Sequence, residues 1–188
     1  MIRQVEYFEK PGKENSERCV EITASLVEEG YNHVVVASTV GDTGVAMARK
    51  VQGKDVNLVI VTHAAGFKEA NQIELLPENR DEIIRLGGKI YTGTILTHSI
   101  ETAFAQKFNG LYPTMIVAQS LRRFGEGPKV CCEIVMEACD AGLIPEFEEV
   151  VAVAGTGRGA DTVCIIKSAA SKRFLDLKVL EILAKPRG

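Results

Sequence analysis

The fold is decided by an apolar run that ends in a glycine-threonine loop, Val34-Val35-Val36-Ala37-Ser38-Thr39-Val40-Gly41-Asp42-Thr43-Gly44. A short β-branched run of this kind predicts a strand that is buried on both faces of a sheet. The small residues after it predict a tight turn into a helix, with backbone that a ligand can approach closely. Strand, loop and helix in this order are typical of an α/β fold.

The same pattern returns near the end of the chain, as Val150-Val151-Ala152-Val153-Ala154-Gly155-Thr156-Gly157-Arg158-Gly159-Ala160-Asp161-Thr162. Both loops combine glycine with small hydroxyl side chains, which can donate hydrogen bonds. We therefore expect the two loops to contact the same ligand.

The remaining sequence alternates between helical and strand patterns. Apolar spacing and capping residues predict helices over residues 16–29, 42–52, 77–86, 99–108, 113–124 and 128–141. Short apolar runs predict strands over 33–37, 56–61, 89–92, 149–154, 162–166 and 177–183, the last two as a hairpin at the sheet edge. The chain is expected to form one three-layer α/β/α domain over residues 1–188.

The strand order follows from the hand of the connections. Right-handed crossovers place the first three strands progressively toward one edge, and the long helical stretch returns the chain to the other side of the first strand. The expected sheet is mostly parallel, with order 3-2-1-4-5 and an antiparallel last strand. Ligands bind such sheets where the winding reverses, here beyond the first and fourth strands, where the two loops lie.

Composition narrows the class of protein. The 188 residues are 46% hydrophobic and 25% charged, with a net charge of −3, which is ordinary for a soluble globular protein and argues against nucleic-acid binding. No apolar run is long enough to span a membrane, and the N-terminal residues lack the apolar core of a signal peptide. None of the five cysteines forms a CxxC pair. We expect reduced thiols, a cytoplasmic location and no metal site.

The first loop is a candidate phosphate site because it opens a helix. The first N–H groups of a helix have no internal acceptor and carry the positive end of the helix dipole. The candidate ligands are Ser38, Thr39, Gly41, Thr43 and Gly44. In the alternative interpretation, Asp42 or Thr43 only caps the helix while Gly41 makes the turn.

The second loop fits the dinucleotide pattern GxGxxA, but its context does not. That pattern should open a helix inside an early βαβ unit, whereas here it precedes a β-branched run near the C-terminus. Arg158 offers a forked cation for a phosphate, and Asp161 could hold the loop or accept from a ligand hydroxyl. The candidates are Gly155, Thr156, Gly157, Arg158, Gly159 and Asp161; the alternative is a glycine-rich turn between two strands.

Two histidines follow predicted strands at the same end of the sheet. His63 and His98 could contact a ligand or transfer protons, and a purely structural histidine is the alternative for His63. Gly66 and Phe67 are expected to flank the non-phosphate part of the ligand, with Asn15 and Thr94 as weaker candidates. The chain contains neither a GxSxG motif nor a GxxxxGK[ST] motif, which argues against a hydrolase elbow and the usual ATPase loop.

The order of these motifs resembles the C-terminal domain of pyruvate kinase. That domain has a 3-2-1-4-5 sheet and holds its effector phosphate with a strand-one loop of the type T-x-[ST]-G-[RK]-[ST]-A, to which residues 38–44 are similar. Its second loop is similar to residues 155–162. Asp42 stands where pyruvate kinase has a basic residue, so a sugar-bisphosphate effector is not implied. The chain has no room for the catalytic barrel, and we expect no pyruvate kinase activity.

The whole chain is similar to a stand-alone family of such domains from archaea and bacteria, in which we also expect the segments 11–15 and 62–67. The resemblance implies flavin mononucleotide (FMN) as the ligand. The sequence thus predicts a domain that binds a phosphorylated small molecule, with homo-oligomers as an open option. A flavin-dependent oxidoreductase with His63 or His98 as proton donor, and a phosphosugar-sensing or subunit-interaction module, are the alternatives.

Overall fold

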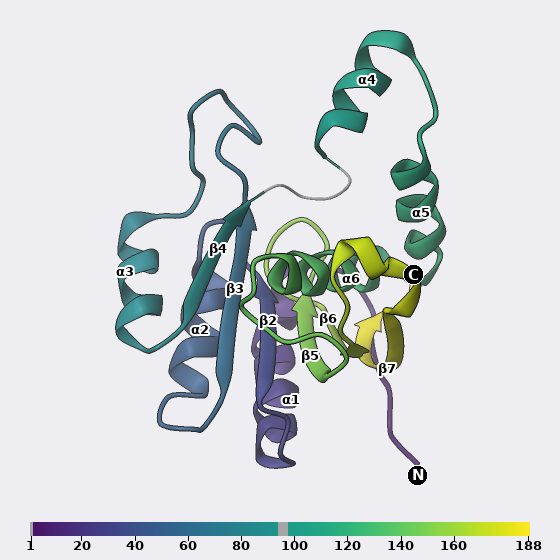
Figure 1. Ribbon diagram of the computed structural model, residues 1–188. Helices are drawn as coiled ribbons and strands as arrows, with labels where there is room; N and C mark the ends of the chain where they lie inside the picture. The colour runs from purple at the N-terminus through teal and green to yellow at the C-terminus, as the bar shows by residue number, and fades with distance from the viewer. Residues whose placement is uncertain (1, 94–97) are drawn as a thin grey trace.

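The computed structural model describes residues 2–93 and 98–188, and within them all strands belong to one sheet (Figure 1). The sheet order is β1-β7-β6-β5-β2-β3-β4. The strands are β1 (Glu6–Phe8), β2 (His33–Ala37), β3 (Asn57–His63), β4 (Lys89–Gly93), β5 (Glu149–Ala154), β6 (Thr162–Lys167) and β7 (Lys178–Pro186).

The expected order 3-2-1-4-5 is present as β4-β3-β2-β5-β6. Strands β4, β3, β2 and β5 are mutually parallel, and β6 is antiparallel to both β5 and β7. The expectation that the final hairpin forms the sheet edge is wrong, because β1 pairs with β7 in parallel and covers it. A strand of only three residues carries too little periodicity to be read from sequence, and its pairing depends on the distant β7.

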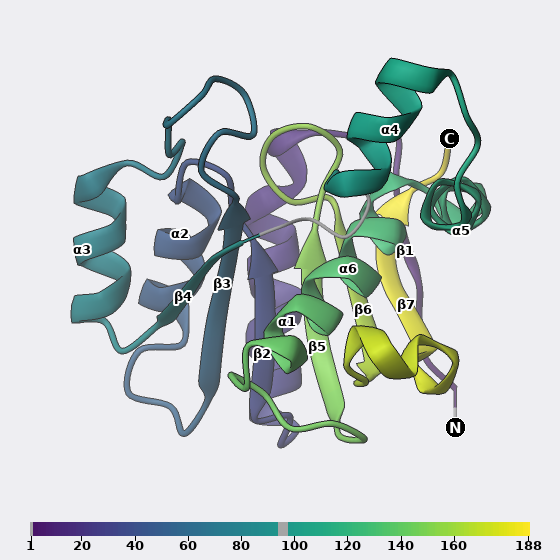
Figure 2. The same ribbon diagram turned by 45° about the horizontal axis from the view of Figure 1, so that its top comes forward.

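Helices cover both faces of the sheet, which gives the expected three layers (Figure 2). Helices α1 (Ser16–Glu28), α2 (Asp42–Lys50) and α3 (Pro77–Arg85) lie on one face, and α6 (Glu126–Asp140) lies on the other. The side chains of β2 alternate between these layers. Val34 and Val36 pack with the first group of helices, whereas Val35 packs with α6. Alternation across a strand thus builds two apolar cores from one β-branched run.

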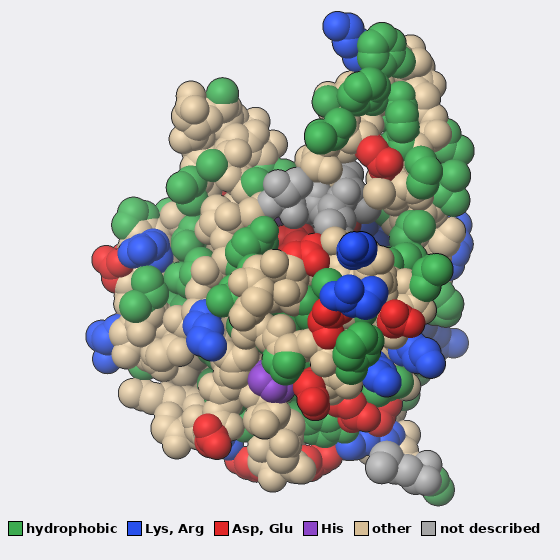
Figure 3. Space-filling view, in the orientation of Figure 1, with side chains coloured by type: hydrophobic (Ala, Val, Ile, Leu, Met, Phe, Trp, Pro, Cys, Tyr) green, Lys and Arg blue, Asp and Glu red, His purple; other side chains and the backbone are tan. Residues whose placement is uncertain are grey.

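The segment before α6 forms an arm that extends from the body of the protein (Figure 1). It contains α4 (Ile100–Phe108), α5 (Pro113–Leu121) and the short 3-10 helix η2 (Arg122–Phe124). No residue of α4 is buried, and its apolar side chains gather on the surface of the arm (Figure 3). The spacing correctly predicted this helix, although its apolar face lacks a core. Across residues 2–93 and 98–188, no helix has the length and apolar character to cross a membrane.

The five cysteines are all free and buried. Burial raises the pKa of the Cys19 and Cys132 thiols to about 12 and that of Cys139 to about 11. Such thiols stay protonated at neutral pH and pack as small apolar side chains. Two further 3-10 helices, η1 (Lys13–Asn15) and η3 (Ser171–Asp176), complete the described secondary structure.

Candidate functional site

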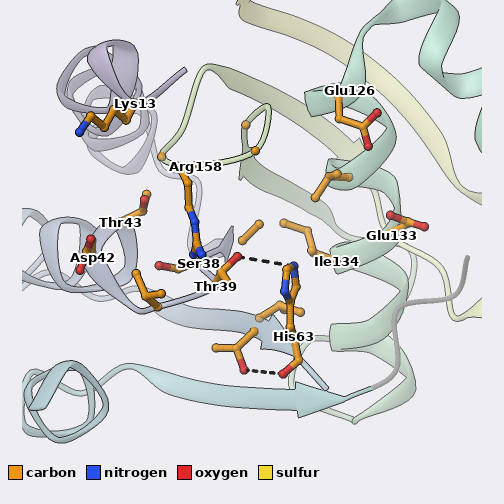
Figure 4. Close-up of a pocket in the computed structure, with 18 of the residues that line it drawn as sticks. Lys13, Ser38, Thr39, Asp42, Thr43, His63, Glu126, Glu133, Ile134 and Arg158 are labelled. Carbon is orange, nitrogen blue, oxygen red and sulfur yellow. Dashed lines mark hydrogen bonds between the residues drawn. The ribbon is translucent and has the colours of Figure 1, made fainter. Parts of the chain in front are cut away.

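A cavity of about 520 Å³ opens at the carboxyl ends of β2, β3 and β5. Its walls come from the loop after β2, the loop after β5, the end of β3 and one face of α6 (Figure 4). This volume lies within the range of about 300 to 1,000 Å³ that small-molecule sites occupy. The two glycine-threonine loops therefore face one cavity, at the point where the sheet changes its winding direction.

The loop after β2 leads directly into α2, and its hydroxyl groups line the cavity. Ser38, Thr39 and Thr43 are all lining residues. The Ser38 hydroxyl accepts from the Gly44 N–H at 3.1 Å, which fixes the loop on the first turn of the helix. The N–H groups of Asp42 and Thr43 have no acceptor among the described residues. These open donors, at the positive end of α2, suit an anion.

The two glycines of this loop shape the turn and lie outside the cavity lining. Gly41 has a φ of 101°, and a Cβ there would lie 2.5 Å from the Cβ of Asn79 on α3. A Cβ on Gly44 would lie 2.9 Å from Ile83, so this glycine allows α2 to pack closely against α3. The Asp42 carboxylate accepts from the Asn79 amide at 2.9 Å, which holds its charge toward α3.

The loop after β5 is fixed by a buried carboxylate. Asp161 is fully buried, and one of its oxygens accepts from the backbone N–H groups of Gly12 and Thr156, each at 3.0 Å. Its other oxygen accepts from the Thr162 hydroxyl at 2.9 Å. Asp161 therefore serves the first of its two expected roles, to hold the loop, and it does not line the cavity.

The tip of this loop also presses against the start of α1. Ser16 accepts from the Ala160 N–H at 2.9 Å, and a Cβ on Gly159 would lie 2.4 Å from the Cα of Lys13. Gly155, Gly157, Arg158 and Gly159 line the cavity, and they are joined there by Lys13 and Ser16, which the sequence had not indicated.

Arg158 and His63 are joined by an acidic residue that sequence reasoning missed. Glu74 is held between them: one carboxylate oxygen lies 2.7 Å from His63 Nδ1 and the other lies 3.5 Å from the Arg158 guanidinium. Figure 4 shows Arg158 extending from its loop toward Ser38 and Thr39. Glu74 lies in a long irregular segment between β3 and α3, where no periodic pattern marks it.

His63 lies at the end of β3 with both ring nitrogens near a polar group. Its Nε2 is 3.5 Å from the Thr39 hydroxyl (Figure 4). Its Nδ1 contacts Glu74. The Phe67 ring lies between the two histidines, with its centroid 4.0 Å from that of His63 and 5.4 Å from that of His98. Burial and the nearby Lys129 ammonium lower the pKa of His98. The structure thus brings both candidate histidines and Phe67 to one end of the cavity.

Some predicted site residues lie elsewhere. Gly41, Gly44, Gly66, Thr156, Asp161 and Asn15 do not line the cavity. Asn15 instead donates from its side-chain amide to the carbonyl groups of Lys10 and Gly12, and so shapes the turn before α1. Thr94 lies outside the described residues.

The wall formed by α6 was not predicted. Its lining residues carry charges at three- and four-residue spacing: Glu126, Lys129, Glu133 and Glu137. Lys129 and Glu133 form an ion pair at 2.6 Å, with side chains only 2% and 5% exposed. Residues at this spacing share one face of a helix, which was the available signal. The adjacent cysteine and apolar residues of α6 indicated a helix that packs in the core, so the charged face was not recognised as part of a site.

Glu137 is the most unusual member of this wall. The residue is 2% exposed, and among the described residues neither carboxylate oxygen has a hydrogen-bond partner. Burial, with a smaller effect of the Glu133 carboxylate, raises the pKa of Glu137 to about 8. No group of three or more His, Cys, Asp and Glu side chains in residues 2–93 and 98–188 is arranged to hold a metal ion.

Comparison with known proteins adds little to this geometry. No family model matches the chain. A crystal structure of O-ureido-L-serine synthase is similar at a TM-score of 0.31 and 19% sequence identity, over 53% of this chain and 30% of that enzyme. A likeness this slight carries no information about activity.

Proposed function

We propose that the protein is a small-molecule-binding domain that holds a phosphorylated ligand between the loops after β2 and β5. The observation that carries this proposal is the cavity itself, which joins the start of α2 to the Arg158 loop at the switch point of the sheet. Pyruvate kinase activity is not part of the proposal.

The phosphate end of the ligand belongs at the start of α2. The open N–H groups of Asp42 and Thr43 and the hydroxyls of Ser38 and Thr39 supply hydrogen-bond donors there. Arg158 is 55% exposed and reaches toward this loop, where its planar guanidinium can donate two parallel hydrogen bonds to one phosphate.

The remaining part of the ligand belongs against the apolar lining, for which we propose the ring system of FMN. Ala37, Val61, Val130 and Ile134 line this part of the cavity, and Phe67 stands at its side. A flat aromatic ring matches such walls, and the resemblance to stand-alone pyruvate kinase C-terminal-like domains supports flavin among phosphorylated ring compounds.

The test is a comparison of FMN with riboflavin, which carries the same ring without the phosphate. Fluorescence titration of the purified protein should give tighter binding of FMN, and Arg158→Ala should weaken FMN binding about tenfold while leaving riboflavin binding the same. Arg123→Ala, which changes an exposed arginine of η2, is the matched control. Equal affinity for both compounds would overturn the phosphate assignment, and protein that takes up no flavin would overturn FMN as the ligand.

A flavin-dependent oxidoreductase is the second candidate, and the contact between Glu74 and His63 favours it. A carboxylate on Nδ1 fixes the orientation of the ring and leaves Nε2 beside Thr39 in the cavity, as an acid-base histidine requires. The flavin, when bound, would supply the redox chemistry. Bleaching of the flavin absorbance by a nicotinamide donor would support this activity. A bound flavin that such donors leave oxidised would favour ligand binding alone.

A further inference from the structure

Glu137 presents a carboxyl group for which the described residues supply no hydrogen-bond partner. It lies on α6, lines the cavity and is 2% exposed, and both of its carboxylate oxygens lack a hydrogen-bond partner among the described residues. Buried polar groups are nearly always paired, because an unpaired group costs about 1 to 3 kcal/mol or more. A group of this kind beside a cavity indicates a partner supplied by the ligand. Because neither oxygen has accessible surface in this structure, the side chain has to turn toward the cavity for the carboxyl group to meet a ligand.

Burial and, to a smaller extent, the surrounding charges decide which form of the Glu137 carboxyl group is present. Glu133 and Asp140 on α6 disfavour a further negative charge. Burial, with a smaller effect of the nearby Glu137 carboxylate, raises the pKa of Tyr91 on β4. The Lys129 ammonium is a nearby cation, but its Nζ lies 2.6 Å from Glu133 Oε2 and forms an ion pair with that carboxylate. With a pKa of about 8, Glu137 carries a proton at neutral pH.

A neutral carboxyl group offers an O–H donor and a carbonyl acceptor side by side. The complementary ligand edge has a carbonyl acceptor next to an N–H donor, as in a cyclic amide or imide. A cationic amine is the less suitable partner, because Lys129 and Arg122 already line the same cavity. Apolar side chains of Val130 and Ile134, on the same helix, would position such a ring.

We propose that Glu137 recognises the ring end of the ligand by donating its O–H to a ring carbonyl and accepting from the adjacent ring N–H. The inference rests on the proposed function, and in FMN the matching edge is that of the pyrimidine ring. The phosphate then binds at α2 and the ring edge binds at α6, on opposite walls of one cavity.

The test measures the dissociation constant of FMN between pH 7 and pH 9. The second pKa of the phosphate is about 6, so the phosphate is already about nine-tenths doubly ionised at pH 7 and its charge changes little in this range. Wild-type affinity should fall about tenfold, since the protonated fraction of a group with a pKa near 8 falls from about nine-tenths to one-tenth. Glu137→Gln keeps a donor and an acceptor but cannot ionise, so its affinity should stay constant with pH. Glu137→Ala should weaken binding about tenfold at pH 7.

Glu148→Gln is the matched control, because Glu148 is an exposed carboxylate after α6 and should leave the wild-type pH profile in place. The same fall in affinity in Glu137→Gln and in wild type would overturn the assignment of Glu137, and so would a flat wild-type profile. Both outcomes leave FMN binding itself intact. Failure of the wild-type protein to bind FMN at any pH overturns FMN as the ligand as well, which separates the two failures.

Discussion

The two walls of the cavity differ in the kind of polar group that faces the ligand. The strand-end wall, residues 38–44 and 155–161, relies on backbone N–H groups and small hydroxyls, and its one lining arginine is 55% exposed. The α6 wall, residues 126–137, relies on charged side chains such as Lys129 and Glu133, which are at most 5% exposed. Substitutions of the charged side chains in the α6 wall are therefore expected to change the stability of the fold. Substitutions of exposed groups in the strand-end wall are expected to change mainly the affinity for the ligand.

The largest expected effect comes from breaking the ion pair in the α6 wall. Lys129→Ala leaves the buried Glu133 carboxylate without its cation, and the unfolding free energy should fall by about 4 kcal/mol in urea titration. Lys172→Ala, at an exposed position, should change it by less than about 0.5 kcal/mol. The double variant Lys129→Met/Glu133→Gln should recover much of the loss. A single variant as stable as wild type would contradict a folding role for this wall.

The second effect is a dependence of stability on pH. The Glu137 carboxyl group loses its proton near pH 4.5 in the unfolded chain and near pH 8 in the folded protein. The folded state therefore binds the extra proton between these values, and wild-type stability should fall as pH rises through this window.

Glu137→Gln removes this titration. Its stability relative to wild type should rise between pH 4.5 and pH 8 and then level off. Thermal unfolding at a series of pH values measures the difference, with Glu148→Gln expected to follow the wild-type curve. Parallel curves for Glu137→Gln and wild type would mean that Glu137 is ionised in both states.

The third effect concerns the anchor of the strand-end wall. Asp161→Ala leaves the N–H groups of Gly12 and Thr156 without their acceptor, and stability should fall by about 2 kcal/mol or more. Asp161→Asn keeps an acceptor oxygen and should lose less. Amide hydrogen exchange at Gly12 and Thr156 should accelerate in the alanine variant. Unchanged exchange at both amides would show that the carboxylate does not hold the loop.

The smallest expected effects come from alanine substitutions at two glycines of the loop after β5. A Cβ on Gly155 would lie 2.4 Å from the Gly159 carbonyl oxygen, so Gly155→Ala must displace the loop and should weaken FMN binding. A Cβ on Gly157 would have no atom within 4 Å, and the positive φ of 80° alone should cost about 1 kcal/mol of stability. Fluorescence titration measures the FMN affinity of both variants, and thermal unfolding measures their stability. Equal losses of FMN affinity in the two variants would contradict this prediction.

The sequence predicts those features that local pattern controls. The strand 33–37 and the strand 149–154 have the bounds of β2 and β5, and their order in the sheet follows from the hand of the crossovers. The loops at their ends face one cavity for the same reason. The short β1 escapes prediction, since its pairing with β7 joins residues at opposite ends of the chain.

The candidate site was harder to predict where side chains from distant segments meet. Glu74 follows no pattern, yet it lies between His63 and Arg158, residues that are 95 positions apart in the numbering. On α6, the charges at 129, 133 and 137 are spaced as on an exposed helix face, but the fold buries them against the cavity. Burial of charge is a tertiary property, and helical periodicity alone does not reveal it.

The contact between Asp161 and the Gly12 N–H has a mechanical consequence. The segment before α1 and the Arg158 loop are fastened to the same carboxylate, so force applied near residue 10 reaches the cavity without passing through the sheet. A tether or a bulky fusion at that end of the chain should therefore shift the Arg158 loop and change the shape of the cavity. A spectroscopic label there, in turn, can register the loop's response to a ligand.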